Sequence, residues 1–222
     1  MANNQNRKII AIDGPSSSGK GTLSKKVAKH FNLPYLNTGA IYRLIALRVS
    51  EHDLTPKLLT GLYEEFETQI PNLVKNITEA ELDNKELFNE EIGKIASIIA
   101  KSQTLRKSIF TYQQEFVSNS AVEFNGCVIE GRDTTTVIAP NADYKFYIEC
   151  DVEIRAKRRC KQLEKNGIKI SFDKILDQLK QRDYNDINRT ESPLRIADDV
   201  MIIDNGASTI EESLEKIIAT IN

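Results

Sequence analysis

The sequence predicts an α/β fold, in which a parallel sheet of about five strands carries helices on both faces. Two observations lead to this prediction. Short apolar runs alternate along the chain with longer amphipathic stretches, as strands and connecting helices do in parallel sheets. The length of 222 residues is enough for one such domain with a small insert.

The expected strands are apolar runs bounded by turn residues. They occupy residues 9–12, 35–36, 127–129, 146–148 and 200–203. Most of them lack polar alternation, which is typical of strands buried on both faces. Ligands of open parallel sheets bind at the carboxyl ends of the strands. The polar motifs that follow Ile12, Leu36 and Ile129 are therefore expected at a ligand site.

The expected helices show apolar residues at helical spacing. They occupy residues 20–31, 39–50, 88–101, 104–119, 151–166, 171–188 and 208–220. Residues 55–90 interrupt the rhythm, and the runs 73–77 and 81–87 predict short antiparallel strands. We interpret 55–90 as a small insert within a single domain, 1–222. Residues 155–190 are expected to form a mobile lid.

The charge, the apolar stretches and the cysteines of the chain argue against several classes of protein. The net charge of −2 gives no overall attraction to nucleic acid, and no stretch reaches the length of a membrane-spanning helix. The polar first residues lack the apolar core of a signal peptide, so we expect a cytoplasmic protein. Three widely spaced cysteines predict neither a disulfide framework nor a zinc site. Cys127 and Cys150 are expected to be buried and Cys160 exposed, with His30 and His52 at the surface.

The segment after the first strand has the pattern of a phosphate-binding loop. Residues 13–22 read Asp-Gly-Pro-Ser-Ser-Ser-Gly-Lys-Gly-Thr, between an apolar run and a helical pattern. Glycines let the backbone approach an anion, and the following helix adds its positive end. Lys20 is expected to reach the β- and γ-phosphates of a nucleoside triphosphate. The predicted loop contacts are Gly14, Pro15, Ser16, Ser17, Ser18, Gly19, Lys20, Gly21 and Thr22.

The residue after Lys20 indicates which class of nucleotide-binding protein the loop resembles. The general motif places Ser or Thr directly after the lysine, to hold Mg²⁺, whereas here Gly21 intervenes before Thr22. This Gly-Lys-Gly-Thr variant resembles nucleoside monophosphate kinases more than GTPases. The absence of an Asn-Lys-x-Asp element for guanine also weakens a GTPase interpretation.

Four further motifs follow the loop in order. They are residues 36–43 (Leu-Asn-Thr-Gly-Ala-Ile-Tyr-Arg), Ser97 with Leu105-Arg106, residues 131–137 (Gly-Arg-Asp-Thr-Thr-Thr-Val) and residues 182–189 (Arg-Asp-Tyr-Asn-Asp-Ile-Asn-Arg). Together with the loop they resemble the bacterial cytidylate kinases over nearly the whole chain. The resemblance implies phosphorylation of CMP and dCMP by ATP, with Mg²⁺ and in a monomer. It also puts the insert on the monophosphate side.

The resemblance implies roles for the arginines. Seven of the eleven lie between Arg132 and Arg195, a distribution that by itself also suits a solvated surface. Transfer between two polyanions needs charge neutralisation and alignment more than covalent chemistry, and guanidinium groups suit that task. By resemblance, Lys20, Arg132, Arg182 and Arg189 are catalytic, and Arg43 and Arg132 hold the acceptor phosphate. Arg158 or Arg159 approaches ATP from the lid.

The resemblance also implies how the acceptor nucleotide is recognised. Asp133 accepts a hydrogen bond from the cytosine amino group, and Ser97 and Arg106 complete base recognition. Asp186 accepts bonds from the ribose hydroxyls, and Arg189 contacts phosphate. Thr38 joins the substrate-binding set. Taken singly, Ser97 and Arg106 also suit a helix surface, and Asp186 with Arg189 also suits a surface ion pair.

The sequence departs from the family pattern at two of these motifs. Asn37-Thr38 stands where Asp-Ser is usual, so a carboxylate is lost. Thr135 stands where glycine is usual, which would strain the backbone if that position needs a positive φ.

Two other functions remain open at this point. One is another small-molecule kinase on the same scaffold, of the shikimate or uridylate type. The other is a non-catalytic ATP-binding switch.

Overall fold

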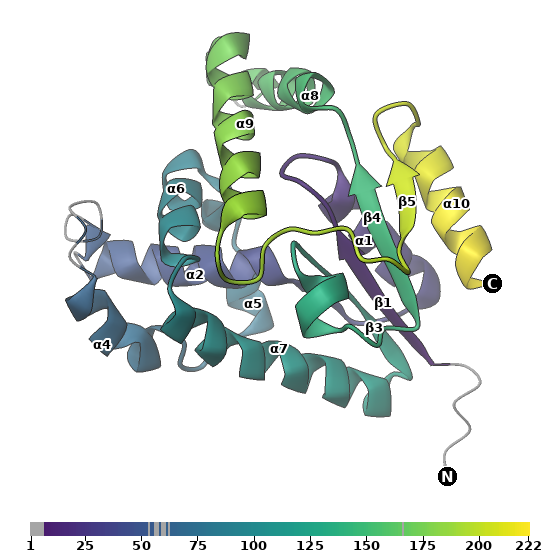
Figure 1. The fold of residues 1–222 in the computed structure, drawn as a ribbon, viewed down its shortest axis with the longest axis horizontal. Coiled ribbons are helices and arrows are strands. Elements are labelled where there is room, and N and C mark those ends of the chain that lie inside the picture. Colours follow the sequence, from purple (N-terminus) through teal and green to yellow (C-terminus); the bar gives the residue numbers. More distant parts are fainter. Residues whose placement is uncertain (1–6, 53, 56–57, 59–60, 62, 166) are drawn as a thin grey trace. The chain divides into compact units, whose positions relative to one another are not determined.

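A computed structural model describes residues 7–52, 54–55, 58, 61, 63–165 and 167–222 (Figure 1). Within these ranges five strands form one sheet, in the order β2-β3-β1-β4-β5. The strands are β1 (Lys8–Asp13), β2 (Tyr35–Asn37), β3 (Gly126–Gly131), β4 (Tyr144–Glu149) and β5 (Met201–Asp204). The chain forms two compact units. Unit 1 comprises the residues up to Leu36 with Val117–Asn222, and unit 2 comprises Asn37–Phe116.

The strand pairs β1–β3, β1–β4 and β4–β5 are parallel, which confirms the predicted fold class. Asp13, the last residue of β1, lies opposite Gly131 on β3 and Tyr147 on β4. This register brings the phosphate-loop motif and the Gly131 motif to the same edge of the sheet. The prediction of full burial is wrong for β5, because this strand lies at the sheet edge and Met201 and Ile202 are exposed.

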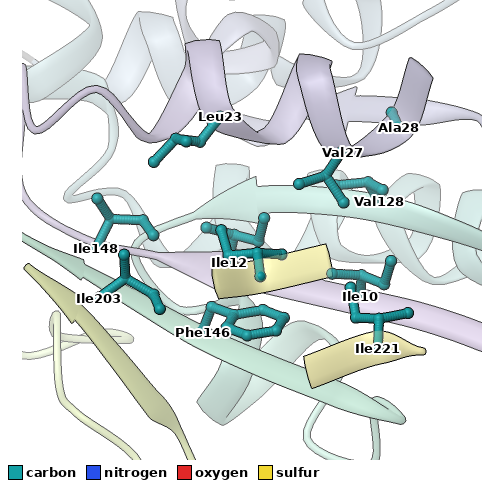
Figure 2. Packing of buried hydrophobic residues seen from close by; sticks show 11 residues of the cluster. Ile10, Ile12, Leu23, Val27, Ala28, Val128, Phe146, Ile148, Ile203 and Ile221 are labelled. Carbon is teal, nitrogen blue, oxygen red and sulfur yellow. The ribbon is translucent and has the colours of Figure 1, made fainter. Parts of the chain in front are cut away.

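The core of unit 1 joins the sheet to two helices, α1 (Lys20–Phe31) and α10 (Ile210–Ile221) (Figure 2). Ile10 and Ile12 of β1 pack with Leu23 and Val27 of α1. Leu23 and Val27 are four residues apart and share one helix face, so the amphipathic pattern of 20–31 fixes how α1 covers the sheet. This packing holds the start of α1 close to the carboxyl end of β1.

A second apolar cluster joins α8 (Val152–Lys165) to α9 (Phe172–Asn188). Its buried members are Ala156, Leu163, Ile175 and Leu179. The two helices pack side by side in Figure 1 and span most of the predicted lid. A short π-helical turn, η3 (Thr134–Ile138), packs on β1 and β3.

Unit 2 is helical. It contains α2 (Thr38–Glu51), α4 (Glu64–Leu73), α5 (Glu79–Leu82), η2 (Lys85–Phe88), α6 (Glu90–Ile99) and the first part of α7 (Gln103–Glu123). The predicted antiparallel strands at 73–77 and 81–87 are therefore wrong. The run 73–77 instead ends α4 and continues into a turn, and Thr78 and Asn84 are the side-chain caps at which α5 and η2 begin. Residues 56–57, 59–60 and 62 of the predicted insert lie outside the described residues.

Several smaller predictions are settled by burial. Cys127 and Cys150 are buried, as predicted, whereas Cys160 is only partly exposed because it packs on the α8–α9 cluster. His30 and His52 are exposed, as predicted. Across the described ranges, no helix combines the length and apolar character needed to cross a membrane.

Candidate active site

The phosphate-loop motif forms a tight turn between β1 and α1. Gly14 has φ 153°, and a Cβ at this residue would lie 2.5 Å from the Ile148 carbonyl oxygen. Gly19 has φ 90°, and Ser17 takes the left-handed region at φ 61° although it is not glycine. Such backbone conformations are costly and cluster at functional sites. The loop is thus built to bring main-chain amides close together.

The helix after the loop leaves its first N–H groups available to an anion. Gly19 is the N-cap of α1 and gives no side-chain cap, and the first turn of α1 contains no acidic residue. The first four N–H groups of a helix have no partner inside the helix, and the helix dipole adds positive potential there. The geometry therefore suits a phosphate group at this point.

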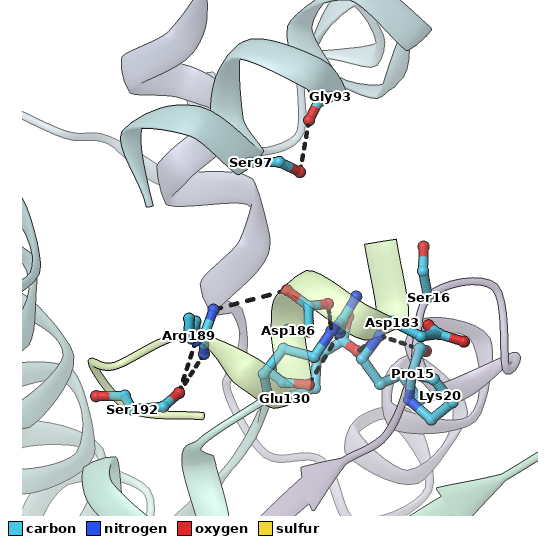
Figure 3. Close-up of polar contacts among 12 residues, drawn as sticks. Pro15, Ser16, Lys20, Gly93, Ser97, Glu130, Asp183, Asp186, Arg189 and Ser192 are labelled. Carbon is cyan, nitrogen blue, oxygen red and sulfur yellow. Dashed lines mark hydrogen bonds and ion pairs between the residues drawn. The ribbon is translucent and has the colours of Figure 1, made fainter. Parts of the chain in front are cut away.

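Lys20 lies deep in the loop. Its Nζ is 3.5 Å from the Pro15 carbonyl oxygen and 3.8 Å from Glu130 Oε2 (Figure 3). Burial lowers the pKa of Lys20 to about 7, and the nearby Arg132 cation acts in the same direction, whereas Glu130 opposes both. Without a ligand, the negative charge of Glu130 does not offset the burial of Lys20 and the repulsion by Arg132. An incoming polyanion would stabilise the charged form of Lys20.

Arg132 and Asp186 form an ion pair that joins the end of β3 to α9. Arg132 Nε donates to Asp186 Oδ2 at 2.8 Å, and both side chains are mostly buried. Arg189 extends the group, with its Nη1 3.7 Å from Asp186 Oδ1 (Figure 3). Burial alone would raise the pKa of Asp186, but Arg132, Arg182 and Arg189 together hold it below its ordinary value. We call Lys20, Glu130, Arg132, Asp186 and Arg189 the loop-edge cluster.

The other predicted cations of unit 1 differ in their surroundings. Arg182 is close enough to Lys20 and Asp186 to shift the pKa of both. Arg158 Nη2 donates to the Asn205 carbonyl at 2.7 Å, beside the end of β5. Arg159 instead donates to Gln162 within its own helix. Of the two predicted lid arginines, Arg158 is the one held at the carboxyl edge of the sheet.

Asp133 and its neighbours fold against the start of the phosphate loop. Asp133 is buried, and the next two residues hold Asp13. Thr134 and Thr135 each donate a backbone N–H and a hydroxyl to the Asp13 carboxylate, at 2.7–3.0 Å. Thr135 is not among the residues with positive φ, so its departure from glycine introduces no left-handed strain. Its hydroxyl instead supplies one of the four bonds to Asp13.

Two predicted residues of unit 2, Arg43 and Ser97, lie on α2 and α6, which pack together. Arg43 of α2 donates to the Leu87 carbonyl at 2.6 Å and to the Asn89 carbonyl at 3.2 Å. Its Nη2 is 2.9 Å from the position of a Cβ on Gly93 of α6, so glycine there makes room for the guanidinium. Ser97 Oγ donates to the Gly93 carbonyl at 3.1 Å (Figure 3). Arg43 and Ser97 thus lie beside the same turn of α6.

Three more residues of unit 2 have defined positions. Asn37 is the N-cap of α2, and its side chain accepts from Ala40 N at 3.2 Å. Thr38, the first residue of α2, is buried. Arg106 donates to the Ala100 carbonyl at 2.7 Å and lies over the ring of Tyr42, 5.4 Å from its centroid. Asn37 therefore replaces the usual carboxylate by a neutral residue that begins a helix well.

Sequence reasoning missed three buried polar residues of unit 1. Glu130 precedes the Gly131 motif and accepts from Tyr35 Oη at 2.7 Å. Arg155 and Asn205 donate to loop carbonyls, at 3.0 Å to Ser16 and 2.6 Å to Ser18. Arg155 lies in the basic run 155–159, where sequence alone does not show which arginine faces inward. Asn205 has no motif around it that indicates its contact.

Comparison with known proteins gives a consistent result. The chain matches the family model described as "Cytidylate kinase" over residues 10–222. It is 40% identical over 206 residues to a cytidylate kinase of Bartonella bacilliformis, covering 92% of this chain and 90% of the relative. It is 37% identical over 217 residues to one of Vibrio cholerae, covering 95% and 94%. An uncharacterised protein of Eubacterium ventriosum of known structure shares the fold, with a TM-score of 0.54, 18% identity and coverage of 97% and 98%. The chain belongs to the cytidylate kinase family.

Proposed function

We propose that the protein transfers the γ-phosphoryl group of ATP to CMP and dCMP by direct in-line displacement. The observation that carries the proposal is the loop-edge cluster, which sets Lys20 and two arginines beside a phosphate loop at one sheet edge. Family membership supplies the nucleotide class. The reaction needs such a cluster because charge must be neutralised on both phosphate groups as they approach.

On this proposal the loop amides and Lys20 bind the β- and γ-phosphates of ATP. Lys20 takes up a proton or keeps one when the triphosphate arrives, because the anion outweighs the burial that lowers its pKa. Arg158 contacts ATP from the edge of β5, and Arg182 adds positive charge near Lys20. These cations stabilise charge on the transferred group without any covalent intermediate.

The acceptor phosphate is assigned to Arg132, Arg189 and Arg43. It is largely ionised at neutral pH, so no strong general base is needed. Arg132 is already oriented by its bond to Asp186, and Arg189 by its bonds to the Ser192 carbonyl. A phosphate would compete for these guanidinium groups and a ribose hydroxyl for the Asp186 carboxylate. Arg43 would exchange its carbonyl partners for phosphate oxygens.

Base recognition is assigned to Asp133, Ser97 and Arg106. A carboxylate suits the exocyclic amino group that distinguishes cytosine from uracil. Asp133 is buried, which strengthens a hydrogen bond to that group. Thr38 is assigned to the acceptor nucleotide by the resemblance of its motif.

Magnesium is expected with ATP, and the chain fits this expectation. Mg²⁺ usually keeps several waters and takes its other ligands from phosphates and one or two protein oxygens. Because Gly21 stands where the general motif has a Ser or Thr ligand, the ion would take its ligands mainly from phosphate oxygens and water. Within the part of the chain that the structure describes, no cluster of three acidic, His or Cys side chains competes as a metal site. When bound, the ion would neutralise phosphate charge.

The proposal is tested by coupled ADP release with CMP, dCMP, UMP and AMP as acceptors. We expect CMP and dCMP to exceed UMP and AMP in kcat/KM by at least about tenfold. Leading activity with UMP or AMP would assign the protein to another kinase specificity. ATP binding without turnover of any monophosphate would favour the non-catalytic switch.

The remaining expectations of a small insert, a mobile lid, a monomer and a cytoplasmic protein are kept as part of this proposal. Exclusion of water from the γ-phosphoryl group is the physical reason to expect a lid. The α8–α9 pair has its own apolar cluster and so has the packing needed to move as one piece. Size-exclusion chromatography with light scattering, with and without nucleotides, checks the monomer.

A further inference from the structure

Two buried side chains from outside the phosphate loop hold two of its carbonyl groups. Asn205, directly after β5, donates from Nδ2 to the Ser18 carbonyl at 2.6 Å. Arg155, on α8, donates from Nη1 to the Ser16 carbonyl at 3.0 Å. Asn205 is 0% exposed and Arg155 is 4% exposed. Both bonds are therefore shielded from competing water.

These bonds fix the direction of the following amides. A trans peptide is planar, and its C=O and N–H point to opposite sides. The described chain contains no cis peptide bond. When the Ser18 carbonyl faces Asn205, the N–H of Gly19 must face away from it. The same holds for the Ser16 carbonyl, Arg155 and the N–H of Ser17.

The orientation of the Asn205 amide is determined by its partners. A carbonyl only accepts, so the group that faces Ser18 is the NH₂. On the other side, Oδ1 accepts from Ser213 Oγ at 3.0 Å. The backbone of Asn205 donates to the Glu149 carbonyl at 2.9 Å. A Cβ added to Gly19 would collide with the Asn205 amide, so the phosphate loop and Asn205 lie in direct contact.

Arg155 is held as firmly from three sides. Besides Ser16, it donates to the Cys150 carbonyl at 2.8 Å and to Asp183 Oδ2 at 2.6 Å. Only a planar guanidinium offers donors in three such fixed directions. Because Asp183 lies on α9, Arg155 links the phosphate loop to the helix that carries Arg182 and Asp186.

We propose that Asn205 and Arg155 are positioning residues for the triphosphate. They preset the Ser18–Gly19 and Ser16–Ser17 peptide planes, so that the N–H groups of Gly19 and Ser17 point at the phosphates before binding. The ligand class is a triphosphate, independent of its base. The inference rests on the proposed role of ATP as phosphoryl donor, and goes beyond it by assigning two residues that need not touch the nucleotide.

The test compares Asn205→Asp with Asn72→Asp. The first substitution keeps the shape but turns an acceptor toward the Ser18 carbonyl. The second makes the same chemical change at an exposed residue, whose amide bonds only Gln69 in the described structure. Binding of inorganic tripolyphosphate, ATP and CMP is measured by calorimetry, well below the thermal midpoint of each variant. Arg155→Lys, with Lys157→Gln as its exposed control, gives a second and independent arm.

We expect Asn205→Asp and Arg155→Lys to weaken tripolyphosphate and ATP by the same factor, at least about tenfold, because the effect lies in the loop amides. CMP affinity should change less than twofold, and both controls should bind like the wild type. Should Asn205→Asp fail to fold, Asn205→Ser removes the same donor with a smaller change. A lower thermal midpoint with unchanged tripolyphosphate affinity would overturn the inference, since it indicates a purely structural role.

The wild type separates this inference from the proposed function. If it binds tripolyphosphate but phosphorylates no monophosphate, the proposed function fails. The comparison of variants then still tests whether Asn205 and Arg155 position the loop amides. If it binds neither tripolyphosphate nor ATP, both fail together.

Discussion

In unit 1 Arg132 donates to the carboxylate of Asp186, whereas in unit 2 Arg43 donates to the backbone carbonyls of Leu87 and Asn89. Unit 2 also has an arginine on a carboxylate, Arg48 with Glu81, but this pair belongs to no predicted site. A phosphate that binds Arg132 must compete with a charged partner. One that binds Arg43 would take the place of the Leu87 and Asn89 carbonyls, because a charged acceptor forms the stronger hydrogen bond with a guanidinium group.

The difference suggests separate tasks. Charge-paired arginines are held in a fixed orientation, which suits alignment of reacting groups, where small displacements reduce the rate strongly. Arg43 donates to backbone carbonyls that an incoming phosphate can displace, which suits substrate capture. We therefore expect substitution of Arg132 to act mainly on kcat, and substitution of Arg43 mainly on the KM for CMP.

The largest effect is expected at Lys20. Lys20→Met should lower kcat/KM by about 10³-fold, because it removes a buried cation from the phosphates. Thermal stability should hold or rise, since burial already disfavours the charge. Lys26→Met, at an exposed lysine paired with Glu211, is the matched control and should leave kcat unchanged. Near-normal turnover of Lys20→Met would exclude Lys20 from the mechanism.

Arg132→Lys and Arg43→Lys test the division of tasks directly. We expect the first to lower kcat about 10²-fold, because a lysine cannot keep both the Asp186 bond and the forked geometry. The second should raise the KM for CMP about tenfold with a smaller change in kcat. Steady-state kinetics with ATP and CMP both varied gives kcat and the KM for CMP of each variant. Equal effects on kcat in both variants would contradict the comparison.

Base recognition offers a smaller contrast. Asp133→Ala should lower kcat/KM for CMP about tenfold to 10²-fold and leave ATP binding within a factor of two, since a buried amino group would lose its acceptor. Ser97→Ala should have a weaker effect, because its hydroxyl already donates to the Gly93 carbonyl. Calorimetric titration with each nucleotide separates the two ligands. Equal losses of CMP and ATP affinity in Asp133→Ala would refute its assigned role.

A further effect, which needs no substitution, is a pH dependence confined to unit 1. With a pKa of about 7, Lys20 is mostly neutral at pH 8–9 in the free protein, whereas a bound triphosphate needs it charged. ATP affinity should therefore fall as pH rises above 7, by up to about tenfold per unit, with uptake of up to one proton on binding. Arginines stay charged throughout, so CMP affinity should remain flat over this range. Titrations in buffers of different ionisation enthalpy measure the uptake, and Lys20→Met should abolish it.

The strands and helices of unit 1, in their order along the chain, and the phosphate loop could be predicted from the residues alone. Apolar runs and helical spacing are local signals, and the loop conformation needs glycines at fixed positions. Both can therefore be recognised in the sequence without knowledge of the fold. Two short runs of unit 2 do not form the predicted strands: residues 74–76 are a turn after α4, and Thr78 and Asn84 begin helices through side-chain caps that outweigh weak strand propensity.

The contacts between polar side chains, in contrast, became known only from the fold. Arg155 and Arg158 lie three residues apart in one basic run, yet the first is buried on Ser16 and the second reaches the Asn205 carbonyl. Asp186 lies 54 residues from Arg132, and Asn205 lies 187 residues from Ser18. Such contacts depend on strand order, register and helix packing, which are set by the whole core and leave no spacing pattern in the chain.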